Sequence, residues 1–123
     1  MKKLLQAEEL AQLAIGILGL YLQPLHFSWW LWVILFLAPD ISMLGYLANT
    51  AIGAYAYNLI HHKLTGVWVL IAGYLLHDDI AVFIGILLFA HSCFDRVFGY
   101  GLKYTDDFKH THLGMIGNKP RNE

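Results

Sequence analysis

Charged residues are scarce in this chain. Only 14% of its 123 residues are Asp, Glu, Lys or Arg, whereas 58% are hydrophobic. Soluble domains carry about 25% charged residues, so this composition excludes an ordinary water-soluble domain and predicts an integral membrane protein with the lipid bilayer as its partner. The formal net charge is −1 and no basic face stands out, so we expect no nucleic-acid partner.

Cysteine is nearly missing as well, and so is any familiar nucleophile motif. The single Cys93 excludes an internal disulfide and leaves the redox compartment open. Ser92 and Cys93 lie in an apolar segment without a recognisable base, and Cys93 is interpreted as a small buried hydrophobic residue. Gly99-Tyr100-Gly101 is too short to form a phosphate-binding loop.

Long apolar runs dominate what remains. They cover residues 10–22, 25–38, 41–60, 67–76 and 80–90, separated by proline, glycine or charged residues. This pattern predicts an all-α, polytopic transmembrane helical bundle of four to five short helices. Residues 1–104 would form the bundle and 105–123 a short polar C-terminal tail. The small residues of 41–60 predict that this helix lies in the middle of the bundle.

The number of spans decides which polar groups meet. With five spans, one face carries the basic residues of the C-terminal half, including Lys119 and Arg121, which predicts that this face is cytoplasmic. The other face then carries an acidic cluster of Asp40, His77, Asp78 and Asp79, although helix capping explains Asp40 and Asp79 without a function. With four spans, these acidic groups join His91 in one larger site.

His91 and Asp95 are the strongest candidates for a functional site. On a continuing helix they lie at positions i and i+4 and project from one face. An imidazole inside an apolar helix costs free energy unless it has a partner, and ionisable residues in membrane segments are usually functional. Gly99 and Gly101 predict that the helix ends just after this pair.

Other histidines could complete a metal site beside this pair. Imidazole and carboxylate suit a divalent transition metal such as Zn or Fe. The predicted ligands are His61, His62, His91, Asp95, His110 and His112, and the residues expected to contact the substrate or support the ligands are Asn58, Arg96, Tyr100 and Tyr104. The alternative is that the histidines cap helices or face solvent, with Asp95 and Arg96 forming an interfacial ion pair.

Three motifs carry a resemblance to a known family. Residues 38–46, 91–104 and 111–114 resemble the small bacterial membrane proteins grouped as domain of unknown function 4260, over essentially the whole chain. The resemblance implies a compact polytopic membrane protein and no particular activity. We expect the protein in the bacterial inner membrane with its C-terminus in the cytoplasm. Pro39-Asp40 and the His91/Asp95 pair are also similar in kind to membrane-bound metal-dependent hydrolases, but the His-Arg-Gly-x-Thr-His stretch of those enzymes is absent.

Three classes of function remain open. The first is a metal-dependent membrane enzyme, a hydrolase or oxidase acting on a lipid-like substrate, in which Arg96 would steer an anionic head group. The second is a proton or ion transport component. The third is a structural or partner-binding membrane subunit, for example in a homo-oligomer. A bound metal with three or more His or Asp ligands would favour the first class.

Overall fold

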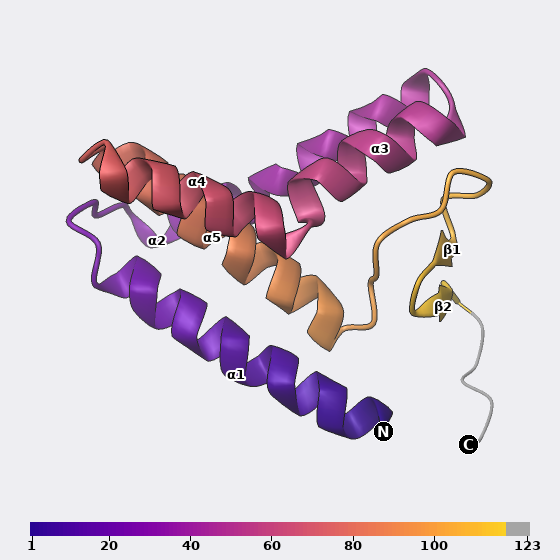
Figure 1. Cartoon of the computed structure of the whole chain (residues 1–123), viewed down its shortest axis with the longest axis horizontal. Helices are drawn as coiled ribbons and strands as arrows, with labels where there is room; N and C mark the ends of the chain where they lie inside the picture. The colour runs from indigo at the N-terminus through magenta and orange to yellow at the C-terminus, as the bar shows by residue number, and fades with distance from the viewer. Residues whose placement is uncertain (118–123) are drawn as a thin grey trace.

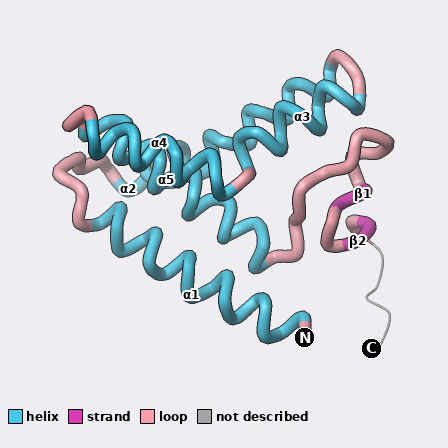
Figure 2. Tube along the Cα trace, viewed as in Figure 1, coloured by secondary structure: helices cyan, strands magenta, loops and turns pink. Residues whose placement is uncertain are grey.

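A computed structural model describes residues 1–117 of the chain. Lys119, Arg121 and the end of the predicted tail therefore lie outside the described residues. The elements are α1 (Lys2–Tyr21), α2 (Trp29–Leu37), the 3₁₀ helix η1 (Ala38–Leu47), α3 (Thr50–His61), α4 (Lys63–Leu75), α5 (Asp79–Val97), β1 (His110–Thr111) and β2 (Gly114–Met115). The predicted all-helical architecture is confirmed, with a small antiparallel hairpin added in the tail (Figure 2).

The predicted helix over 41–60 is in fact two elements. η1 follows α2 directly and turns back into α3 through Ala48 and Asn49, whose side chain accepts a hydrogen bond from the Ile52 amide at 2.8 Å. Such a cap satisfies a backbone donor that the new helix cannot pair internally. Pro39 lies in the first turn of η1, where its missing donor does no harm.

The central helix is α5, which corrects the prediction that 41–60 occupies the middle. It packs against α1 on one side and α4 on the other (Figure 1). The helix α3 packs mainly against η1 and extends away from α5. Gly66 and Gly73 of α4 lie against the α5 backbone, since a Cβ on either would come within 3.0 Å of it. Small residues thus bring α4 and α5 close together. They also do so between η1 and α3, where a Cβ on Gly45 would lie 3.1 Å from Gly53 Cα.

The core is small and the outside of the molecule is apolar. Buried residues of α1 and α5 form the core: Leu13, Leu20, Phe83, Leu87, Ala90 and Cys93. Many large side chains face outward instead, among them Trp29, Ile41 and Leu47 at 80%, 65% and 85% exposure. Two stretches, Trp29–Leu47 and Asp79–Val97, are long and apolar enough to cross a membrane; four to five spans remain a prediction.

Asp78 begins α5 as its N-cap. Its carboxylate accepts hydrogen bonds from the amides of Ile80 at 3.0 Å and Ala81 at 3.3 Å. Replacing Asp78 with alanine should lower the free energy of unfolding by about 1 kcal/mol, the usual effect of losing an N-cap. Denaturant unfolding in detergent measures it. Asp78→Asn, which retains an acceptor, should change little; an equal loss in both variants would contradict the capping role.

Candidate metal centre

Four side chains from three helices converge at one point. Asp40 comes from η1, His61 from the end of α3, and His91 and Asp95 from α5, and one ligand atom of each lies within 4.8 Å of all the others. The two Nε2 atoms of His61 and His91 are 3.1 Å apart, and each is 3.2 Å from Asp40 Oδ1. Asp95 Oδ2 lies 3.5 Å from His61 Nε2 and 3.6 Å from His91 Nε2.

Backbone carbonyls fix the protonation of both imidazoles. His91 Nδ1 lies 2.6 Å from the Phe36 carbonyl oxygen, and His61 Nδ1 lies 2.9 Å from that of Tyr57. A carbonyl oxygen only accepts, so each Nδ1 carries the proton and donates it. In a neutral imidazole the lone pair is then on Nε2, the atom that faces the centre. Two lone pairs and two carboxylate oxygens therefore face one another and repel unless a cation or a proton lies between them.

The spacing of these atoms fits a tetrahedral metal ion. Zinc binds imidazole nitrogen and carboxylate oxygen at about 2.0–2.2 Å, which places tetrahedral ligand atoms about 3.4 Å apart. The five separations given above run from 3.1 to 3.6 Å. Hydrogen bonds from outer partners to the ligands, here through both Nδ1 atoms, are typical of protein metal sites. The residues present therefore fit a divalent transition metal.

Tyr57 and Arg96 support the ligands from behind. The Tyr57 hydroxyl donates to Asp95 Oδ2 at 3.1 Å, and its ring stacks on His61 with centroids 3.8 Å apart. Arg96 donates to the carbonyl oxygens of His61 at 3.3 Å and Tyr100 at 3.0 Å. Among the described residues no carboxylate lies within ion-pair distance of Arg96, so the alternative of an Asp95–Arg96 ion pair is wrong.

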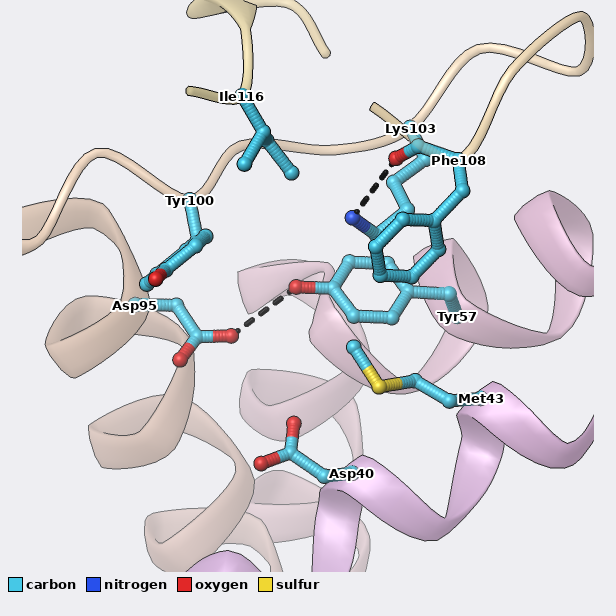
Figure 3. Close-up of a pocket in the computed structure, with 8 residues that line it drawn as sticks. All are labelled: Asp40, Met43, Tyr57, Asp95, Tyr100, Lys103, Phe108 and Ile116. Carbon is cyan, nitrogen blue, oxygen red and sulfur yellow. Dashed lines mark hydrogen bonds between the residues drawn. The ribbon is translucent and has the colours of Figure 1, made fainter. Parts of the chain in front are cut away.

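The centre is buried on one side and open on the other. His61 and His91 are almost fully buried, whereas 41% of the Asp40 side chain is exposed. A cavity of ≈ 380 Å³ begins there, and Figure 3 shows Asp40 and Asp95 on one wall with Lys103 and Phe108 opposite. Its lining residues are Asp40, Met43, Tyr57, Asp95, Tyr100, Lys103, Phe108 and Ile116.

Three of the six predicted metal ligands lie elsewhere. His62 is exposed and caps α4, where its Nδ1 accepts from the Leu64 amide at 3.1 Å. His110 lies 2.8 Å from Asp106, and this hydrogen bond holds the pKa of the Asp106 carboxyl below its ordinary value. His112 Nδ1 accepts from the Leu102 amide at 2.8 Å. Burial, with the nearby Arg96 charge, lowers the pKa of His112.

Of the residues predicted to contact the substrate or support the ligands, some lie at the centre or its cavity and others do not. Asn58 bonds the backbone of Lys103, donating to its carbonyl oxygen and accepting from its amide, both at 2.7 Å. Tyr100 lines the cavity, whereas Tyr104 stacks on His110 with ring centroids 4.1 Å apart. Asn58 therefore fixes the tail over the centre and does not reach the ligands.

The predicted acidic cluster of Asp40, His77, Asp78 and Asp79 does not form. Asp40 is at the histidines, whereas His77 makes the turn before α5 with a φ of 54°. Asp79 and Asp95 are at opposite ends of α5, about 24 Å apart at 1.5 Å per residue. The four-span alternative anticipated that acidic groups join His91, but only Asp40 does so.

Two polar residues that line the cavity, Tyr57 and Lys103, are not among the site residues predicted from the sequence. Tyr57 lies four residues before His61, a spacing that places both on one helix face and could have indicated their contact. Lys103 follows a turn after α5 and had no local signal of this kind.

Comparison with known proteins gives a family and no activity. No curated protein and no solved structure is significantly similar to the chain. The weaker similarity to metal-dependent hydrolases thus stays a prediction. A family model described as "Domain of unknown function (DUF4260)" matches residues 2–116, a range that includes Asp40, His61, His91 and Asp95. Because this match spans nearly the whole sequence, the chain belongs to the DUF4260 family.

Proposed function

We propose that this protein is a metal-dependent membrane enzyme, a hydrolase or oxidase that acts on a lipid-like substrate. Asp40, His61, His91 and Asp95 would bind a divalent transition metal, Zn²⁺ or Fe²⁺. The observation that carries the proposal is the convergence of four ligand atoms, with five of their six separations between 3.1 and 3.6 Å and all of them within 4.8 Å. Both imidazoles face this point through the unprotonated nitrogen, which is the form that binds metals.

A membrane location is supported by the surface and by the position of the site. The side chains of Ile41, Leu44 and Leu47 in η1 are 62% to 85% exposed, which is unfavourable in water and favourable in lipid. Asp40, His91 and Asp95 belong to the two stretches able to cross a bilayer. Ionisable residues in such stretches usually mark a function. We also propose that the C-terminal face lies in the cytoplasm of a bacterial cell, because it carries most of the basic residues.

The cavity favours catalysis over a purely structural metal. Structural zinc sites are closed, whereas catalytic sites have a position for water or substrate. With all four side chains bound, the metal would gain this position by expanding to five coordinates on the side of the cavity. Asp40 is partly exposed and borders the ≈ 380 Å³ cavity, so a substrate can reach the centre from that side. A bound metal would supply Lewis acidity there and activate water or oxygen. Tyr57 and Arg96 would hold the ligands in place.

A proton transport component is the second candidate function, and one pattern of contacts favours it. The Tyr57 hydroxyl, Asp95, the two imidazoles and the exposed Asp40 form a continuous chain of polar contacts. Such a chain can hold and pass protons, as expected of a proton transport component. In that case the cation between the lone pairs would be a proton.

Metal analysis separates the two candidates. Protein purified in detergent without chelator should contain stoichiometric metal, and exchange with Co²⁺ should give the visible absorption of a four-coordinate site. Asp40→Asn should weaken binding, because it replaces an anionic ligand by a neutral amide. Asp79→Asn, far away on α5, is the matched control and should bind as the parent does. A parent protein that takes up no stoichiometric metal would overturn the enzyme proposal.

A further inference from the structure

A buried ammonium group lies across the cavity from the metal centre. Lys103 is only 4% exposed and comes from the coil that follows α5 (Figure 3). Its Nζ donates to the Phe108 carbonyl oxygen at 3.1 Å and lies 3.8 Å from the centroid of the Phe108 ring and 4.7 Å from that of Tyr57. Among residues 1–117, no carboxylate lies within 4.0 Å of this nitrogen.

Lys103 therefore has unused binding capacity. An ammonium carries three donors, and the Phe108 carbonyl takes one of them. Burial lowers the pKa of Lys103 because it penalises the charged form, while Asp95 and Asp40 act in the opposite direction from across the cavity. Two aromatic faces stabilise the cation only in part. An anion entering the cavity would meet a cation that is already desolvated and fixed in position.

The charges around the cavity indicate how negative this anion should be. Asp40, Asp95 and Lys103 line the cavity, and the buried Arg96 lies behind it, where it donates to the carbonyl oxygens of His61 and Tyr100. Together these four side chains carry two negative and two positive charges. Neutral imidazoles add none, so the site is balanced without a metal. A divalent metal would leave two positive charges in excess. A phosphate monoester carries about −1.5 to −2 at pH 7, whereas a carboxylate or a phosphodiester carries about −1.

We propose that the cavity binds a phosphate monoester group of the substrate, with Lys103 donating to a phosphate oxygen opposite the metal centre. This inference rests on the proposed metal function and names its substrate class. Met43, Phe108 and Ile116 supply the apolar part of the cavity wall beside the charged groups. The same phosphate chemistry is found in a lipid such as phosphatidate and in a soluble ester such as glycerol 3-phosphate.

Calorimetric titration of zinc-loaded protein with inorganic phosphate tests Lys103. Lys103→Met should weaken phosphate binding by roughly ten-fold to hundred-fold, the usual effect of losing a hydrogen bond to a charged group. Lys103→Arg should retain most of the affinity because it keeps the charge. Lys109→Met, which removes an exposed lysine of the same segment, should bind phosphate as the parent does. Lys103→Gln gives the same comparison if Lys103→Met does not fold.

Binding of two further ligands distinguishes a lipid phosphate from a soluble phosphate ester as the substrate. Tighter binding of phosphatidate in detergent micelles than of glycerol 3-phosphate would support a lipid substrate, and equal binding a soluble one. Metal content is measured in every variant and should not change. The role of Lys103 in phosphate binding is wrong if metal stays bound and phosphate binds Lys103→Met as well as it binds the parent. It is also wrong if the metal-loaded parent does not bind phosphate. In both cases the metal proposal stands. A parent without metal overturns the proposed function itself.

Discussion

Replacing His61 with alanine should abolish stoichiometric metal binding, whereas the same change at the adjacent His62 should leave it intact. The two residues are neighbours in sequence, but His61 Nε2 lies among Asp40, His91 and Asp95, and His62 caps α4 at the surface. Loss of His61 would remove one of the four proposed ligands, the one that α3 contributes. The effect should exceed the roughly 10- to 100-fold that loss of an outer partner of a ligand costs in metal affinity.

Metal content and metal-dependent thermal stability together measure this difference. A metal that binds only the folded protein raises Tm, so the parent and His62→Ala should become more stable when Zn²⁺ is added. His61→Ala should show no such rise. The His62→Ala variant also controls for general damage, since it loses a helix cap. Equal metal content in the two variants would show that His61 is not a ligand and would remove α3 from the site.

Replacing Gly85 with alanine should strongly destabilise the packing of α4 on α5, the helix that carries His91 and Asp95. A Cβ at Gly85 would lie 2.3 Å from the Leu70 amide nitrogen and 2.6 Å from its Cα, and both are backbone atoms that cannot rotate away. The two helices would have to separate along their contact. Overpacking of a tight interface costs about 1–3 kcal/mol and occasionally more, and we expect the upper end here.

Gly19→Ala is the matched control. Its Cβ would meet only the Ile86 side chain, at 3.3 and 3.6 Å, which can adjust. Both changes replace a helical glycine by the better helix former, so any gain in propensity is the same in each. Denaturant unfolding in detergent should therefore show a large loss for Gly85→Ala and a small change for Gly19→Ala. Similar stability in the two variants would mean that α4 and α5 do not pack as closely as described.

Much of the local structure could be predicted from the sequence. Composition and apolar runs indicated helices, and the i, i+4 spacing placed His91 and Asp95 on one face, where the structure has them 3.6 Å apart between Nε2 and Oδ2. The end of α5 at Val97, followed by Gly99 with a φ of 85°, also agrees with the prediction. These features depend on residues within a few positions of one another, so pattern alone is informative.

Element boundaries were harder to predict. The helix α1 begins at Lys2, well before its apolar run, because lysine, glutamine, alanine and glutamate favour a helix whether or not they are buried. The apolar pattern of 41–60 runs through Asn49 and does not predict the division there, because the Asn49 cap forms only where the chain turns from η1 into α3.

The sequence by itself determined that this chain is helical and apolar and that one helix carries an imidazole and a carboxylate side by side. Only the tertiary structure decided what completes that pair. It selected Asp40 and His61, left His62, His110 and His112 outside, and placed Lys103 across the cavity. The physical reason is that Asp40 and His61 are 51 and 30 positions from His91 along the chain, so their contact depends on how the helices pack.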